Sequence, residues 1–307
     1  MTNQLELAQL DPDALRLLEA YKKGQHGALL QEVDNLSKAG SVTPGVLGVA
    51  AMACTALERY DEAIKAATAA LAQQSGWAWL YHALAAAEAG QGHLDRAVAA
   101  QGRAVRLMPR EPSYAAALAQ YLRRSGQLQQ AVAVARQALV GDPTHGGALN
   151  EYGLALLESG SAGPALEQFR LAQSAEPAEP AGYINEGVLH LRAEARGEAR
   201  RSFGQALRCR PGMSEAEDYI ADTFVGQRGL LRATLGHLLA LGRVNLLGWV
   251  MIAFVYYLAF RLLQFLWRAW PVLLPAAQVL LVITLVWLLG GLALGRLIRV
   301  AFAAVAR

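Results

Sequence analysis

The sequence predicts an all-α protein, an α-solenoid of about five 34-residue helix-turn-helix units plus caps, followed by two transmembrane helices. Three observations lead to this prediction. Prolines recur every 34 residues at Pro109, Pro143, Pro177 and Pro211, with Ser75 in the preceding place. Alanine stands 12 and 5 residues before each of these five positions. Two long apolar stretches, nearly free of charge, follow the last repeat.

The paired alanines lie seven residues apart, so they share one face of a helix, two turns along. A small side chain there lets the neighbouring helix approach closely. Glycine lies 17 residues before Pro109, Pro143 and Pro177, at Gly92, Gly126 and Gly160, and predicts the turn that ends the first helix. Each proline ends the second helix. The alanine pairs are Ala63 and Ala70, Ala97 and Ala104, Ala131 and Ala138, Ala165 and Ala172, and Ala199 and Ala206.

This pattern resembles the tetratricopeptide repeat (TPR) family over about 170 residues, with a helix, a turn and a second helix in each 34-residue unit. The last two units match the family most fully, with Gly153 and Phe169 in one and Gly187 and Phe203 in the other. Tyr183 and Asn185 fill two further family positions. Earlier units replace the aromatic residue by Ala67, Gln101 and Ala135, and the glycine by Ala51, Ala85 and Ala119.

The predicted repeats are flanked by capping segments, because the ends of a repeat stack are usually atypical. Residues 1–43 are interpreted as degenerate N-terminal capping helices, with helical spacing at 14–23 and 28–37. Residues 214–243 hold a capping helix from Ser214 to about Val225, with Glu217 completing a capping box, and then a juxtamembrane amphipathic segment. The repeat superhelix spans 44–213, in units 44–77, 78–111, 112–145, 146–179 and 180–213.

The resemblance implies a concave groove, lined by the first helix of each unit, that binds a partner protein or peptide. No unit carries the lysine, asparagine and arginine clamp with which some relatives hold a C-terminal carboxylate. Trp79 has an equal alternative as a packing residue between units. Arg123 with Arg124 is more often a solvated helix end than a ligand clamp. The candidate groove residues are Trp79, His82, Gln120, Arg123, Asn150, Leu154, Leu157, Val188 and Arg192.

Charge divides the chain into two parts. All 25 acidic residues lie at or before Asp222 with 20 of the 28 basic ones, so this part has a net charge of −5. The 85 residues that follow carry eight arginines and no acidic residue. Nucleic-acid binding is not expected, because the repeat region is acidic and the basic residues lie beside apolar stretches.

Residues 244–307 are interpreted as a membrane hairpin with a basic tail, with spans at about 244–267 and 271–295. Each is long enough to cross a bilayer. Arg261 either reaches towards the interface or meets a partner's membrane helix. Gly291 and Gly295 are spaced to let another helix approach, so self-association or docking of a membrane protein is a further hypothesis.

Six arginines flank the outer ends of the two spans, against two at the turn between them, which predicts that both termini face the cytoplasm. The polar first ten residues do not resemble a secretory signal. We therefore expect a two-span protein of the inner, cytoplasmic membrane with the repeats facing the cytoplasm. The use of 24 arginines and four lysines suggests a bacterial source.

No cofactor, metal site or catalytic group is expected, and the chain is not predicted to be an enzyme. The six histidines are scattered without metal-ligand spacing. Cys54 and Cys209 are interpreted as reduced thiols, with Cys54 packed as a small apolar residue.

The leading functional hypothesis is a membrane-anchored scaffold or adaptor that binds a partner in its groove and assembles or recruits a membrane-associated complex. The alternative is an integral accessory subunit of a transporter, secretion or envelope-synthesis complex, in which the hairpin makes the main contacts and the repeats regulate. A third hypothesis is a soluble protein whose apolar tail packs in a homo-oligomer.

Overall fold

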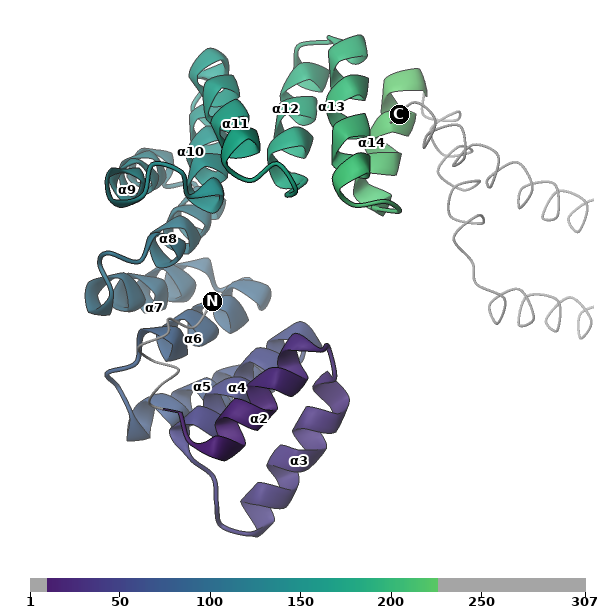
Figure 1. Cartoon of the computed structure of the whole chain (residues 1–307). Helices are drawn as coiled ribbons and strands as arrows, with labels where there is room; N and C mark the ends of the chain where they lie inside the picture. Colours follow the sequence, from purple (N-terminus) through teal and green to yellow (C-terminus); the bar gives the residue numbers. More distant parts are fainter. Residues whose placement is uncertain (1–9, 226–307) are drawn as a thin grey trace, which may run out of the picture. The chain divides into compact units, whose positions relative to one another are not determined.

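The computed structural model describes residues 10–225, which form thirteen α-helices and no strand (Figure 1). The chain divides into two compact units, one ending at Pro177 and the other beginning at Ala178. The first unit contains α2 to α11 and the second contains α12 to α14. The helices are α2 (Pro12–Lys22), α3 (His26–Lys38), α4 (Pro44–Ala56), α5 (Tyr60–Gln73), α6 (Ala78–Gly90), α7 (Leu94–Leu107), α8 (Pro112–Arg124), α9 (Leu128–Gly141), α10 (Gly146–Glu158), α11 (Ala162–Ala175), α12 (Ala181–Arg192), α13 (Arg196–Cys209) and α14 (Ser214–Val225).

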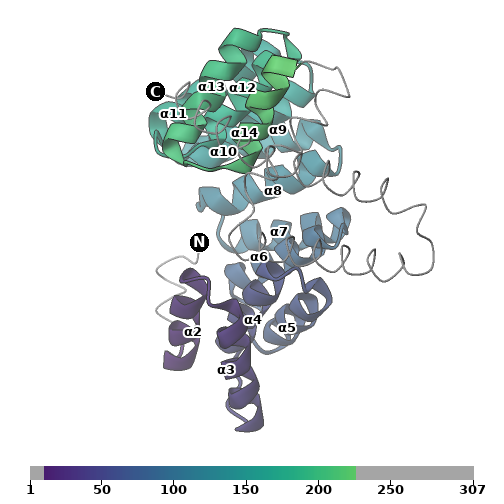
Figure 2. The ribbon, with the colours of Figure 1, turned by 90° about the vertical axis from the view of Figure 1, so that its right-hand side faces the viewer.

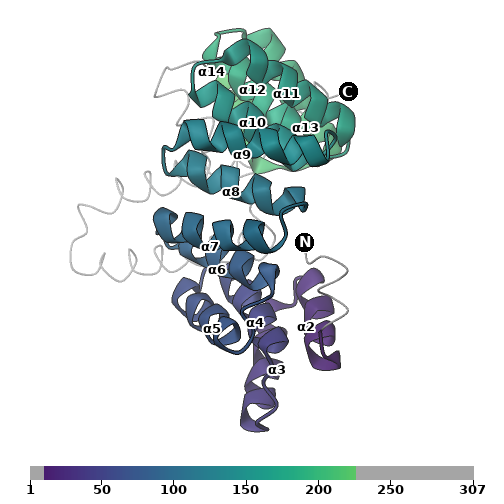
Figure 3. The same cartoon turned by 90° about the vertical axis from the view of Figure 1, so that its left-hand side faces the viewer.

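The predicted repeats are present as pairs of packed helices. In the first unit α4 packs with α5, α6 with α7, α8 with α9 and α10 with α11. Neighbouring first helices also pack, α4 on α6 and α8 on α10. Figures 2 and 3 show from opposite sides that the helices from α4 to α9 are stacked in chain order. In the second unit α12 packs with α13, and α14 covers α13.

The ten repeat alanines are buried where neighbouring helices pack together, as predicted. None is more than 8% exposed, and eight of them are fully buried. A side chain of this size lets the helix axes come close, because larger residues at the crossing would separate the helices. We call these ten positions the alanine seam.

Side-chain volumes at a second pair of positions are matched within each unit. The rings of Phe169 and Phe203 occupy the space that a β-carbon on Gly153 and Gly187 would need. Where the sequence replaces the glycine by alanine, the ring is gone as well. The matched pairs are Ala51 with Ala67, Ala85 with Gln101, Ala119 with Ala135, Gly153 with Phe169, and Gly187 with Phe203.

The turn inside each unit requires a left-handed residue. Gly92, Gly126 and Gly160 have φ of 89°, 81° and 87°, as expected for glycines that end a helix. Glu58 and Glu194 occupy the same repeat position with φ of 59° and 58°. A residue with a β-carbon is strained in this conformation. Two of the five units therefore keep the turn at a cost in stability.

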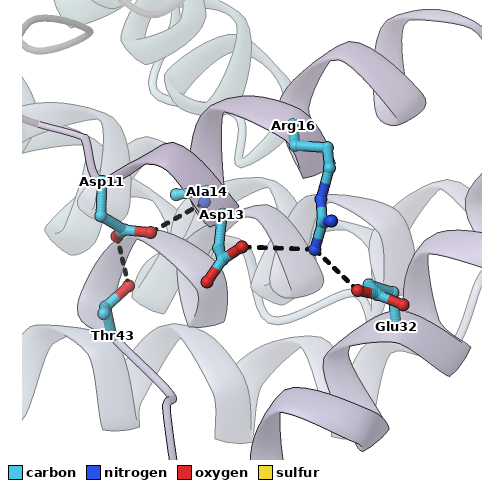
Figure 4. A network of polar contacts seen from close by, with 6 residues as sticks. All are labelled: Asp11, Asp13, Ala14, Arg16, Glu32 and Thr43. Carbon is cyan, nitrogen blue, oxygen red and sulfur yellow. Dashed lines mark hydrogen bonds and ion pairs between the residues drawn. The ribbon is translucent and has the colours of Figure 1, made fainter.

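The N-terminal cap is joined to the first full repeat by hydrogen bonds (Figure 4). Asp11 caps α2 by accepting from the Ala14 N–H at 2.9 Å, and it accepts from the Thr43 hydroxyl at 2.6 Å. Thr43 in turn caps α4. Partial burial opposes ionisation of Asp11, but these hydrogen bonds outweigh it and lower the pKa of its carboxyl. Arg16 on α2 pairs with Glu32 on α3 at 2.6 Å.

No helix between residues 10 and 225 has the length and apolar character needed to cross a membrane. The predicted spans at 244–267 and 271–295 lie outside the described residues. The same holds for Arg261, Gly291 and Gly295, and for the juxtamembrane segment after α14.

Replacing Gly153 by alanine is expected to destabilise the fragment of residues 1–225 by about 1–3 kcal/mol, because the new methyl group overlaps the Phe169 ring. Phe169→Ala alone should cost about 3–5 kcal/mol. The double variant has the same residues as the Ala119 and Ala135 pair, so its loss of stability should be smaller than the sum of the losses in the two single variants. Urea unfolding followed by circular dichroism measures each value. Additive losses would contradict the volume match.

The control is Gly102→Ala in the interior of α7, where a β-carbon meets only the end of the Arg106 side chain at 3.7 Å. This change should stabilise the same fragment by about 0.5–1 kcal/mol through helix propensity.

Glu58→Gly and Glu194→Gly are each expected to stabilise the fragment by about 0.5–1 kcal/mol, because glycine removes the strain of the left-handed conformation. Gly126→Ala is the matched opposite change and should destabilise by about 1 kcal/mol. The same urea unfolding experiment measures these differences. A loss of stability in both glutamate variants would show that contacts of these side chains outweigh backbone strain.

Candidate functional site

The first helices leave one accessible surface in the first unit, which we call the first-helix face. It includes the partly exposed side chains of Gln120 on α8 and of Asn150 and Leu154 on α10. Helices α8 and α10 pack side by side. Gln120 and Leu154 are 34 residues apart and therefore occupy the same place in successive repeats. The face presents amide and aliphatic side chains next to each other, which suits a peptide with mixed polar and apolar contacts.

Trp79 does not line this face, so its assignment to the groove is wrong. Its side chain is only 2% exposed. The ring fills the space beside Gly48 and stacks on Trp77, with ring centroids 6.0 Å apart. The indole N–H is buried without a hydrogen-bond partner. Trp79 is a packing residue between α4 and α6, the alternative that the sequence left open.

Arg123 already forms ion pairs with two carboxylates. Its guanidinium donates to Glu151 at 3.1 Å and to Glu158 at 2.7 Å, both on α10. Its side chain is 15% exposed. Arg123 is therefore neither a solvated helix end nor a free ligand clamp. It joins the C-terminal half of α8 to α10.

The charges of this cluster depend on one another. Burial disfavours the charged form of Arg123, but Glu151 and Glu158 outweigh it and raise the pKa of Arg123. Burial also raises the pKa of Glu151, although Arg123 opposes this shift. The arginine thus favours the ionised form of the largely buried Glu151 carboxyl, against the effect of burial.

His82 belongs to a buried polar junction that the sequence did not reveal. Its Nδ1 lies 3.0 Å from Gln101 Oε1, and Gln101 Nε2 donates to the Tyr114 carbonyl at 2.8 Å. The His82 and Tyr114 rings also contact, with centroids 5.6 Å apart. Burial lowers the pKa of His82, despite the hydrogen bond with Gln101, and this favours the neutral imidazole. In the sequence, this junction is indicated by Gln101, a polar residue at a position where the TPR pattern has an aromatic one.

The remaining candidates do not share the first-helix face of the first unit. Leu157 is 9% exposed and packs inside. Val188 and Arg192 lie on α12 in the second unit, where Val188 is partly buried and Arg192 is exposed at the C-terminal end.

A serine and histidine pair on α8 and α10 has a structural role. His145 Nδ1 accepts the Ala148 N–H at 3.0 Å and so caps α10. The other ring nitrogen, Nε2, then carries the proton and donates to Ser113 Oγ at 3.2 Å. A nitrogen that carries the proton cannot take one from the hydroxyl, so the pair lacks a general base.

Residues 10–225 contain no group of three or more histidine, cysteine or acidic side chains that could bind a metal ion. Cys54 and Cys209 form no disulfide among the described residues, and burial raises the pKa of the Cys54 thiol. The thiol form of Cys54 is therefore favoured, in agreement with its packed position.

Comparison with solved structures shows the fold. A thermophilic TPR protein from Thermus thermophilus is 22% identical with a TM-score of 0.51, and the match covers 55% of this chain and 93% of that one. The APC/C hetero-tetramer Cut9-Hcn1 is 17% identical with a TM-score of 0.62, and the match covers 80% of this chain and 49% of that one. No family model matches the sequence, and neither does any curated protein. The described helices are therefore a TPR-like α-solenoid.

Arg123→Met is expected to destabilise the fragment of residues 1–225 by about 3 kcal/mol at pH 7, because it leaves Glu151 buried without its partner. The native pKa of Glu151, already above its ordinary value, should rise further. A carboxyl with a raised native pKa is most favourable when protonated, so the loss should shrink as the pH falls below that pKa. Urea unfolding between pH 4 and 8 measures both effects.

Glu151→Gln provides the control for this prediction. The double variant Arg123→Met with Glu151→Gln removes the unpaired charge and should recover most of the lost stability. If the double variant is as unstable as Arg123→Met, packing rather than charge explains the role of Arg123.

Proposed function

We propose that the chain is a protein-interaction scaffold that holds a segment of a partner protein on the first-helix face. The observation that carries the proposal is which residues of that face are not packed within the fold. The alanine seam, Trp79 and Arg123 are all used within the fold. Gln120, Asn150 and Leu154 are partly exposed on two adjacent helices, and Gln120 and Leu154 take the same place in successive repeats.

Adjacent amide and aliphatic groups suit an extended peptide or the side of a helix. Amides donate to and accept from a peptide backbone, and Leu154 contributes apolar contact area. The repeat fold supports this role because successive units present equivalent residues at a regular spacing along one surface.

The proposal includes a membrane tether at residues 244–295. The sequence supports it through two apolar stretches, each long enough for a span, and through arginines outside their ends. In this arrangement the solenoid faces the cytoplasm of a bacterial inner membrane and brings its partner to the bilayer. The protein then assembles or recruits a membrane-associated complex.

The second candidate function is that of an integral accessory subunit of a transporter, secretion or envelope-synthesis complex. Arg261 favours it, because an arginine inside a predicted span is costly unless it meets water or a partner. In that arrangement the membrane helices make the main contacts and the repeats regulate.

The two candidates are separated by a pull-down of the full-length protein in mild detergent from cells that contain it. Gln120→Ala combined with Leu154→Ala should reduce the yield of a specific partner by about tenfold, because each change removes accessible contact area from the first-helix face. Trp79 and Arg123 are left unchanged because altering them destabilises the fold.

The control variant is Gln130→Ala combined with Leu171→Ala, which makes the same changes at exposed positions on the second helices α9 and α11. It should retain the partner. A partner lost only with Arg261→Leu, and kept by the first-helix variant, would support the accessory-subunit function instead.

A further inference from the structure

The second helices carry a recess that the first-helix face does not explain. A cavity of about 290 Å³ opens between the end of α7, the start of α8 and the C-terminal half of α9. A shallower hollow of about 450 Å³ continues along the outer side of α9 and shares Gln137 and Val140 with it. Figure 3 shows α7, α8 and α9 in succession on this side. The α9 recess is lined by Val105, Pro109, Arg110, Pro112, Ala115, Leu118, Val134, Gln137, Ala138, Val140 and Gly141.

The recess exists because one repeat lacks a large side chain. The fourth residue of each unit is leucine or tyrosine in four of the five repeats, but it is Ala115 in the unit 112–145. Ala115 remains 8% exposed and lines the cavity. The volume that a leucine or tyrosine fills in the other units is thus open to solvent here. The large fourth residues of the other units are Leu47, Tyr81, Leu149 and Tyr183.

The rim of the α9 recess is apolar and positively charged. Val140 is 82% exposed, more than any other large hydrophobic residue that the structure describes. Four exposed arginines lie on α7, at the turn after it and on α9, and none pairs with a carboxylate among residues 10–225. Residues 94–141 contain seven arginines and two acidic residues, within a repeat region whose net charge is negative. The four arginines are Arg103, Arg106, Arg110 and Arg136.

We propose that the α9 recess is a second docking site, separate from the first-helix face, for an acidic peptide segment of a partner protein. One leucine- or phenylalanine-sized side chain of the partner enters the volume above Ala115. Carboxylates on either side of it pair with Arg110 and Arg136, which line the recess and the adjoining hollow. With two such surfaces the scaffold holds two partners at once.

Charge complementarity identifies the occupant. Residues 226–307 carry eight arginines and no acidic residue, so this chain's own tail does not supply the carboxylates. A flat anionic membrane surface would pair with the arginines but would not fill the recess. An acidic peptide with a bulky apolar residue uses both.

The test uses the full-length protein and a short fluorescein-labelled peptide with glutamates on both sides of one phenylalanine, measured by fluorescence anisotropy. This peptide should bind. A second peptide with alanine in place of phenylalanine should bind at least about tenfold more weakly, because the apolar side chain no longer fills the recess. A third peptide with lysines in place of the glutamates should not bind.

Two variants of the protein test the two halves of the site. Ala115→Leu restores the residue type of the other repeats and fills the recess. It should therefore lower the affinity for the phenylalanine peptide at least about tenfold. Arg110→Glu with Arg136→Glu should weaken it by a similar factor through charge repulsion. Val140→Asp, at a fully accessible position, gives an independent variant that does not depend on how the core accepts the larger side chain of Ala115→Leu.

Matched controls are Ala69→Leu, at an exposed position on α5, and Lys38→Glu with Lys65→Glu, at exposed positions on α3 and α5. Both should bind like the unchanged protein, as should the first-helix variant Gln120→Ala with Leu154→Ala.

Three outcomes would overturn the proposal. The first is peptide binding that is unaffected by Ala115→Leu and Val140→Asp. The second is loss of peptide binding in the first-helix variant, which would place the peptide on the other face. The third is binding of phosphatidylglycerol vesicles that needs Arg110 and Arg136 while the peptide does not bind, which would identify a lipid-binding surface.

Discussion

The close approach of paired helices at the alanine seam is the constraint on which the rest of this structure depends. Ten alanines, two in each second helix, are almost completely buried. In each unit a further pair of positions, one on each helix, holds side chains whose sizes are related. Glycine occurs opposite phenylalanine, and alanine occurs opposite alanine or glutamine. The units differ in sequence, but phenylalanine occurs only in those units that have glycine opposite it.

Departures from the large apolar residues of the repeat produce the features that distinguish one repeat from another. Gln101 replaces a ring, and its amide is satisfied by His82 and by the Tyr114 carbonyl. A buried polar group needs such partners, so one substitution requires both a histidine and a backbone carbonyl within reach. Ala115 replaces a leucine or tyrosine, and no neighbour compensates for the lost volume. The first departure makes a junction between three helices, and the second leaves a recess.

Charged residues follow a similar division between structure and surface. Arg123 resembles a ligand-binding arginine by its position in a first helix, but two carboxylates of α10 already satisfy it. Four other arginines near α7 and α9 have no such partner within the described residues. An arginine's availability for a ligand therefore depends on the helix packed next to it, because opposite charges a repeat apart in sequence meet only after the units stack.

The sequence alone determined the helix pairs, their 34-residue period, the buried alanines and the left-handed turn glycines. These features depend on local backbone geometry and on periodic spacing, both of which can be read along the chain. Only the tertiary structure decided that Trp79 is packed against Gly48, that Arg123 is paired with Glu151, and that Ala115 leaves a cavity. Each of these outcomes depends on the size or charge of a residue in a different helix. The period gives the place of a side chain in its own helix, whereas its neighbour across the interface fixes whether it is buried, paired or exposed.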